Sequence, residues 1–163
     1  NDEKGQLSGE YMLLVGSLIV VLMISIFMIA NENELNIAMA AAKSGADEGV
    51  ASSSSAIYPK ETFNEYDDME GLKHPYSVSI VNVSYNSSGI DENYGKQKIQ
   101  FKVYAKASAD YNKKELDSIG DRINYNLRKS VATSFNTTDS TNKLYNPVFS
   151  NNYVFTTANV VWV

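Results

Sequence analysis

Three asparagines in the second half of the chain could carry covalent chemistry. Asn82, Asn86 and Asn136 each begin an Asn-x-Ser/Thr triplet, the acceptor pattern for N-linked glycosylation. Such triplets also arise by chance in a chain rich in Asn, Ser and Thr, so their surroundings matter. Asn86 and Asn136 are predicted to lie in loops. Asn82 lies within a predicted strand and qualifies only if its side chain faces outward. We predict N-linked glycans at these three positions.

Side chains that usually bind metals or act as nucleophiles are scarce. The chain has no Cys and one His, His74, which stands beside Pro75 and is interpreted as a loop residue. The acidic group Asp67, Asp68 and Glu70 lacks the spaced oxygen ligands of a calcium loop. No nucleophile elbow or paired-acid motif stands out. We therefore expect no enzyme activity, no metal and no cofactor.

One carboxylate stands beside a long apolar run. Glu10 precedes the segment 11–30, which holds no charged residue and is rich in Leu, Ile, Val and Met. A run of about 18 or more apolar residues is long enough to cross a bilayer as a helix. A carboxylate is costly in hydrocarbon unless it is paired, whereas near a helix N-terminus at the membrane interface it is favoured. The sequence predicts that the chain is embedded in a membrane at some stage.

A single helix over residues 8–52 is expected to continue beyond this run. Leu35, Ala38, Met39, Ala42 and Ala46 follow at helical spacing, so the helix changes from apolar all round to amphipathic. We interpret it as a stalk whose small residues let neighbouring helices approach closely. These small residues are Gly9, Gly16, Ser17, Ser25 and Ala30. The residues expected to pack in a core of such helices are Leu14, Val15, Leu18, Val21, Leu22, Ile26 and Ile29.

The rest of the chain is predicted to fold as one β-rich head domain over residues 56–163, after a stalk at 6–55. Alternation predicts strands at 76–85, with a change of phase at Ile80-Val81, and at 96–107. A loop is expected at 86–95. Apolar residues at spacings of three and four predict a helix over 113–134, with Asp110 or Asn112 as its cap.

The last part of the chain is interpreted as a second hairpin, formed by residues 144–149 and 153–163. The fold class expected is α+β: a long N-terminal hydrophobic helix and a four-stranded antiparallel sheet with one packed helix. Trp162, the only Trp, is expected on a core-facing strand or in a contact between subunits.

Charge divides between these parts. Residues 1–55 carry seven acidic and two basic side chains, whereas residues 56–163 carry 12 of each sign. Because the head has no basic surplus, nucleic acid is not expected as a partner.

The residues before the apolar run carry a family resemblance. Lys4-Gly5 precedes the motif residues Gln6, Ser8, Glu10 and Tyr11. This arrangement resembles the class III signal peptide of archaeal type IV pilins, in which Lys-Gly stands before Gln-x-Ser-x-Glu-Tyr/Phe and an apolar helix. The resemblance covers about the first 50 residues. The remaining two thirds match no motif, which is usual for pilins because their heads vary.

The resemblance implies a processing and assembly route. A leader peptidase would cleave between Gly5 and Gln6, which makes residues 1–5 a candidate leader remnant. An assembly ATPase and a platform protein would then extract subunits from the cytoplasmic membrane into a helical homopolymer. Counted from Gln6, Glu10 is the fifth residue, where the pilin glutamate pairs with the N-terminal amine of a neighbouring subunit and fixes axial register. If the mature protein began at Asn1, Glu10 would be its tenth residue and would not lie at the expected distance from the amine. Mature N-termini at Asn1 and at Gln6 are both considered.

We therefore expect a structural subunit, a pilin of an extracellular archaeal type IV pilus that serves in adhesion. Its partners would be identical subunits, the membrane before assembly and the assembly machinery. One alternative is a single-span membrane protein with an external binding head that never polymerises. Another is an archaellin, although the helix expected at 113–134 disfavours it, because archaellin heads are usually all-β.

Overall fold

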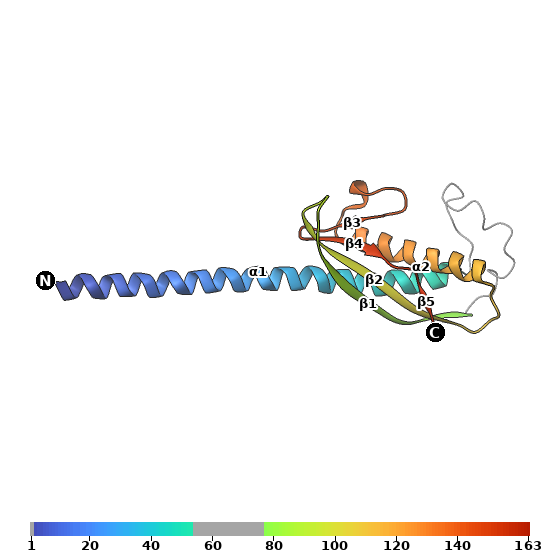
Figure 1. Ribbon diagram of the computed structural model, residues 1–163, viewed down its shortest axis with the longest axis horizontal. Helices are drawn as coiled ribbons and strands as arrows, with labels where there is room; N and C mark the ends of the chain where they lie inside the picture. The colour runs from blue at the N-terminus through green and yellow to red at the C-terminus, as the bar shows by residue number, and fades with distance from the viewer. Residues whose placement is uncertain (1, 54–76) are drawn as a thin grey trace. The chain divides into compact units, whose positions relative to one another are not determined.

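The computed structural model describes residues 2–53 and 77–163, with side chains for residues 8–52 and 77–163. The expectations for His74, the acidic group at 67–70 and the end of the stalk at 54–55 lie outside the described residues. Two helices, a short 3-10 helix and a five-stranded sheet give the expected α+β class (Figure 1). The elements are α1 (Asp2–Ser53), β1 (Val78–Asp91), β2 (Lys96–Ala107), α2 (Lys113–Ser134), η3 (Thr138–Ser140), β3 (Val148–Phe149), β4 (Tyr153–Thr157) and β5 (Val161–Trp162).

The chain forms two compact units, Asn1–Asn36 and Ile37–Val163. The boundary falls inside α1, so the last turns of this helix belong to the unit that holds the sheet. Helix α1 begins at Asp2, six residues before the predicted start. Within the second unit, the predicted apolar stripe is confirmed at Ala38, Ala42 and Ala46, which are fully buried.

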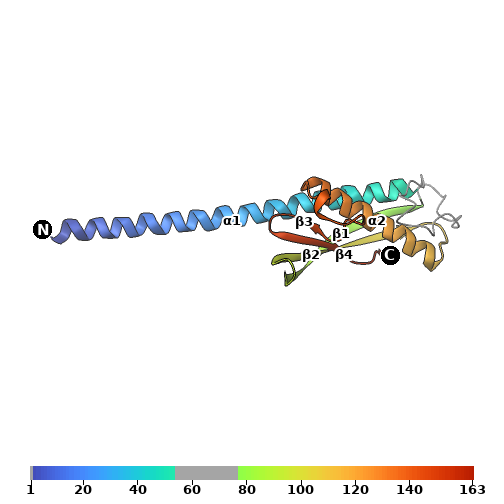
Figure 2. The same cartoon turned by 90° about the horizontal axis from the view of Figure 1, so that it is seen from above.

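Helix α1 contacts α2 through glycines. A Cβ on Gly45 would lie 2.6 Å from the carbonyl oxygen of Asn126 and 2.7 Å from the Cβ of Ser130. At Gly49, one turn later, a Cβ would lie 2.8 Å from the Cα of Ile123. Real Cβ atoms do not approach other heavy atoms so closely, so only glycine fits at these two positions. Figures 1 and 2 show the last turns of α1 running alongside α2.

Helix α2 has the predicted bounds, 113–134. Its cap is Asn112 rather than Asp110: the Asn112 Oδ1 accepts from the Glu115 backbone N–H at 2.9 Å, and the Glu115 carboxylate accepts from the Asn112 N–H at 2.9 Å. This reciprocal capping box satisfies two donors that the first turn would otherwise leave unpaired. The predicted apolar stripe is buried at Ile119, Ile123, Leu127 and Val131, and its first member, Leu116, is half-buried.

Strand β2 also has the predicted bounds, and its inward residues Ile99, Phe101, Val103 and Ala105 are all buried. Strand β1 pairs with it antiparallel. The predicted change of phase is confirmed as a bulge: Ile80 pairs with Ala105 and Asn82 with Tyr104, which leaves Val81 without a partner on β2. One extra residue therefore changes the face on which the following residues lie.

The prediction of a loop over residues 86–95 is wrong. Strand β1 continues to Asp91, and only residues 92–95 form the turn to β2. Asn86 pairs with Gln100 and Ser87 with Ile99, after which a second irregularity falls at Ser88 and Gly89, with Gly89 at φ 82°. The glycine supplies the left-handed backbone that this bulge needs. Pairing with β2 thus overrides the turn-forming composition of the segment.

The predicted four-stranded antiparallel sheet is also wrong, because the sheet is mixed. Its order is β1-β2-β4-β3, and β5 pairs with β2 as well. Strands β4 and β5 both run parallel to β2, while β3 and β4 form an antiparallel hairpin. This hairpin is shorter than predicted, because residues 144–147 lie outside β3 and the strand predicted over 153–163 is interrupted at 158–160. The reason lies in α2, because a 22-residue helix returns the chain along the length of the sheet, and the next strand to pair with β2 then runs parallel to it.

Aromatic rings fill the core between the sheet and α2. The Phe155 ring lies 5.6 Å from that of Phe101 and 5.7 Å from that of Phe135, both stacked, and 5.8 Å from that of Tyr153. Such ring pairs stabilise a core beyond the area that they bury. The chain has no Cys, so packing of this kind stabilises the second unit without disulfides.

Candidate functional site

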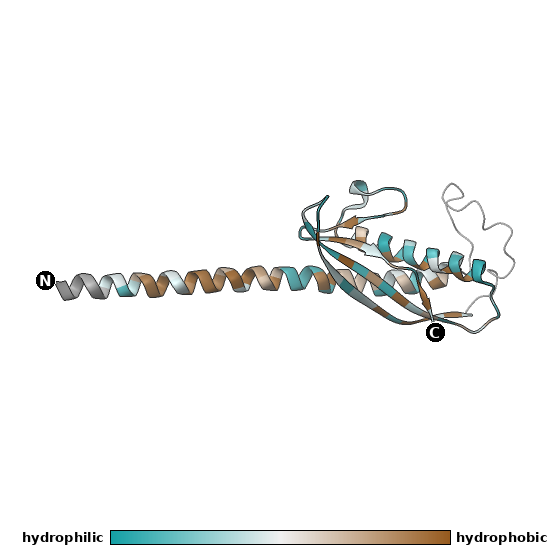
Figure 3. Ribbon diagram, in the orientation of Figure 1, coloured by the Kyte–Doolittle hydropathy of each residue, from teal (hydrophilic) through white to brown (hydrophobic). Residues whose placement is uncertain are grey.

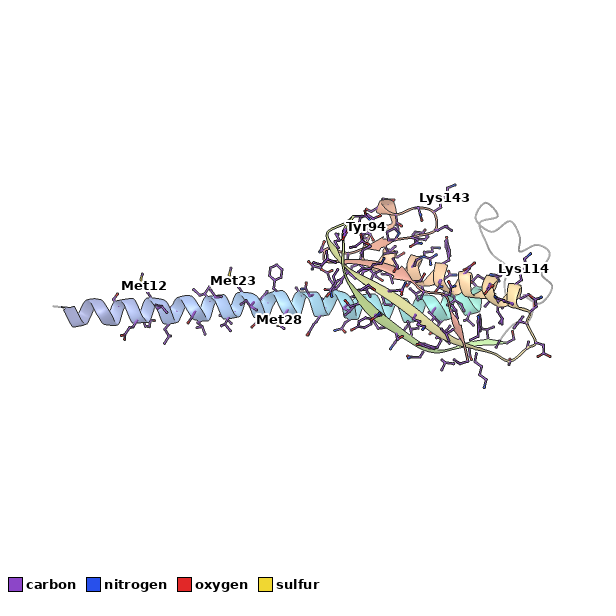
Figure 4. All side chains as sticks on the ribbon, in the orientation of Figure 1. Met12, Met23, Met28, Tyr94, Lys114 and Lys143 are labelled. Atoms are coloured by element: carbon purple, nitrogen blue, oxygen red, sulfur yellow. The ribbon has the colours of Figure 1, made fainter. Side chains whose placement is uncertain are left out.

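The candidate site is the apolar surface of α1 over residues 11–30. Consecutive residues of a helix point about 100° apart, and Tyr11, Met12, Leu13 and Leu14 are each between 64% and 77% exposed. Apolar side chains therefore face every direction around the axis. Figure 3 shows the ribbon of this stretch mostly in the brown of hydrophobic residues. Figure 4 shows Met23 and Met28, whose side chains leave the helix on different sides.

Six of the seven residues predicted to pack in a filament core are exposed, and Val15 is half-buried. The exposed six are Leu14, Leu18, Val21, Leu22, Ile26 and Ile29. An apolar surface of this length is rare on soluble monomers and marks a site of contact with other proteins or with a membrane. The structure thus places the predicted set where an external partner can cover it.

The polar side chains inside this surface are satisfied by the helix itself. The Ser17 hydroxyl donates to the Leu14 carbonyl oxygen at 2.8 Å, and the Ser25 hydroxyl donates to the Val21 carbonyl oxygen at 2.8 Å. Because each hydroxyl already has an acceptor, lipid or another apolar helix can surround these residues without a desolvation penalty. A Cβ on Gly9 or Gly16 would meet nothing within 4 Å, so both glycines are open to a neighbouring helix.

The motif residues lie at the start of the same helix. Ser8, Glu10 and Tyr11 are exposed. Gly5 and Gln6, the predicted cleavage pair, belong to the backbone of α1, and the side chain of Gln6 lies outside the described part. Glu10 is the one acidic or basic residue between Ser8 and Asn31. A single charge therefore adjoins the apolar surface.

By length and composition, the part of α1 from Ser8 to Ser52 could cross a membrane, and it is the one helix among the described residues that could. A signal sequence near an N-terminus has the same length and composition.

All three asparagines of the glycosylation triplets are exposed. Asn82 and Asn86 lie on β1, where Asn82 pairs with Tyr104 and Asn86 with Gln100. The Val81 bulge turns the Asn82 side chain outward, as the prediction required. Asn136 follows α2 in a turn with φ 55°. The expected loop position therefore holds for Asn136 but not for Asn86.

Sequence reasoning missed the glycine contact of α1 with α2, although Gly45 and Gly49 form a Gly-x-x-x-Gly pattern that predicts close helix packing. The described residues include no group of His, Cys, Asp or Glu that could hold a metal ion.

Neither the family models nor the curated proteins and solved structures that were compared with the chain gave a match.

Proposed function

We propose that the chain is the structural subunit of a filament that polymerises through residues 8–30 of α1. The observation that supports this is the exposure of apolar side chains on all sides of residues 11–30 within that segment. One packed neighbour would cover one face only, so the whole circumference needs lipid or several helices. Identical subunits supply such helices in a helical polymer.

The transfer from membrane to polymer is energetically reasonable. An apolar helix that leaves lipid for a bundle of like helices never exposes its surface to water, so no hydrophobic free energy is lost on the way. Gly9 and Gly16 permit close approach, and the serine hydroxyls stay paired with their own backbone. The same surface would therefore serve for storage in the membrane and for assembly.

The Lys-Gly and Gln-x-Ser-x-Glu-Tyr pattern at residues 4–11 favours one kind of filament, an archaeal type IV pilus on the cell surface that serves in attachment. In this proposal a leader peptidase cleaves between Gly5 and Gln6, and Glu10 pairs with the amine of a neighbouring subunit. The exposed Asn82, Asn86 and Asn136 would carry N-linked glycans. The presence of α2 favours a pilin over an archaellin.

A second candidate is a single-span membrane protein that never polymerises, because α1 is long and apolar enough to cross a bilayer. Shearing cells that produce the protein tests the two candidates. A filament subunit is released as fibres that sediment at high speed and are visible by electron microscopy, whereas an anchored monomer stays in the membrane fraction.

The substitution Leu18→Asp tests the role of the apolar surface directly. Leu18 is 56% exposed, and a carboxylate at the centre of an apolar bundle costs about 2.5–3.5 kcal/mol or more per subunit. We expect the variant to form no filaments while the unit 37–163 keeps its unfolding transition. Leu18→Met, which keeps an apolar side chain, should still assemble. Normal filaments from Leu18→Asp would exclude assembly through this surface.

A further inference from the structure

A cavity in the second unit lies between the first half of α2 and the segment that ends in β5. Its volume is about 360 Å³, within the range of small-molecule sites. Lys113, Asp117 and Asp121 line one wall, at four-residue spacing along α2. Asn159 and Trp162 line the opposite wall. Lys114, labelled in Figure 4, marks this end of α2.

The wall opposite α2 is held in place by backbone hydrogen bonds. The Ala158 N–H donates to the Phe101 carbonyl oxygen at 2.8 Å, and the Val163 N–H donates to the Ala105 carbonyl oxygen at 2.9 Å. The Asn124 side chain also donates to the Ala158 carbonyl oxygen at 2.9 Å. Residues 159–162 are thus fixed on both sides, and Trp162 is presented from a rigid strand.

Gly120 sets the depth of the cavity where the two walls meet. A Cβ at this position would lie 3.3 Å from the Cβ of Val160 and 4.0 Å from Cζ2 of Trp162. A side chain at position 120 would displace Val160 or occupy part of the cavity. Glycine at this position therefore lets α2 and the segment of Val160 approach each other at the base of the cavity and leaves the cavity open above them.

The two carboxylates lie one helical turn apart on α2, and both residues are exposed. Burial raises the pKa of the Asp121 carboxyl, Arg128 opposes that shift, and Asp117 adds to it.

We propose that this cavity binds a neutral sugar ring. The C–H face of a pyranose would pack on the Trp162 indole, while its hydroxyls donate to Asp117 and Asp121 and pair with Asn159 and Lys113. A cation fits less well, because the Lys113 ammonium shares the wall with the carboxylates. Both carboxylates lie on one wall and do not flank a bond, so the site binds and does not hydrolyse. This inference does not depend on filament formation.

The chain provides its own probe, because Trp162 is its only Trp. The full chain would be solubilised in a polyoxyethylene detergent, which has neither a sugar nor a quaternary ammonium head group. Glucose, galactose, mannose and N-acetylglucosamine would each be titrated to about 100 mM, a range suited to weak sites, while Trp162 emission is recorded. We expect a saturable change with at least one of these sugars.

Three variants distinguish sugar binding in this cavity from an indirect effect of the sugar on Trp162 emission. Asp117→Asn should weaken binding about tenfold, because the sugar hydroxyl loses a charged acceptor and hydrogen bonds to charged groups are the stronger ones. Asp139→Asn, an exposed position on η3 outside the cavity, should bind like the unmodified chain. Trp162→Phe should lose the saturation-transfer NMR signal of the bound sugar.

The proposal would be overturned if none of the sugars altered the Trp162 emission, or if Asp117→Asn bound sugar as well as the unmodified chain. It would also be overturned if tetramethylammonium, and none of the sugars, gave a response that depends on Asp117. The last would mean that the cavity is a cation site.

Discussion

Two glycines determine how closely α1 and α2 pack in the second unit. At Gly45 and Gly49 the backbone of α1 lies where a Cβ would overlap atoms of α2. Close backbone contact of this kind gains dispersion energy along the whole crossing, but it tolerates no added atoms. The packing of the two helices is therefore specified by the absence of side chains.

Gly45→Ala should destabilise the unit 37–163 despite the higher helix propensity of alanine. The added methyl would lie 2.6 Å from the Asn126 carbonyl oxygen, and we expect a loss of about 1–3 kcal/mol in the free energy of unfolding. Urea denaturation, monitored through Trp162 fluorescence emission, measures this loss of stability. Gly16→Ala is the matched control, since a Cβ there meets nothing within 4 Å. Equal stability of the two variants would contradict the contact.

At the residue scale, the sequence predicts the apolar surface of the candidate site well. Leu14, Leu18 and their neighbours are apolar in a run too long for a buried helix, so their exposure to a partner follows from composition. The cavity could not be predicted in this way. Trp162 and Asp117 are 45 positions apart along the chain, and only the parallel pairing of β5 with β2 brings Trp162 to α2.

Among the elements, α2 and β2 follow from periodicity because each buries one face. Ile119, Ile123 and Leu127 recur at helical spacing, and Ile99, Phe101 and Val103 alternate. The mixed sheet does not follow, because β3 and β5 have only two residues each and carry no period of their own. The length of β1 was missed for a similar reason: Asn86–Gly89 has the composition of a turn, and its strand conformation comes from pairing with β2.

The capping box of α2 can be tested by Asn112→Ala. This change removes the acceptor for the Glu115 N–H and should cost about 1 kcal/mol of stability. Thermal unfolding of the full chain in detergent measures the loss, with Trp162 fluorescence emission as the signal. Asp110→Ala serves as the control, because Asp110 is exposed and Asn112 is the cap. If the two variants melt at the same temperature, the cap contributes nothing to stability.

For the whole molecule, the division between the two units matters more than the bounds of α1. The sequence predicts a domain boundary at 55/56, three residues after the expected end of the helix at 52. The compact unit that holds the sheet begins at Ile37, within α1, and Ala42, Gly45 and Ala46 are buried in it. A boundary inside a continuous helix cannot be located from helix-ending signals.

Two shortened chains test this division. A chain of residues 37–163 should be soluble without detergent and unfold cooperatively, since it keeps the buried stripe of α1 and lacks the apolar surface. A chain of residues 56–163 should aggregate or stay unfolded, because the face of α2 that Gly45 and Gly49 contact would be open to water. Size-exclusion chromatography and circular dichroism distinguish them. Equal folding of both would show that α1 is dispensable for the head.

Because Val81 of β1 has no partner on β2, the gene should tolerate the deletion of its codon. With this residue removed, Val78, Ile80 and Val83 would alternate regularly and face the core, while Asn82 would keep its outward direction. An in-frame loss of the Val81 codon should therefore be tolerated inside a strand, where deletions usually invert every later side chain. Loss of the codon for Val83, only two positions on, would instead place Ser84 in the core.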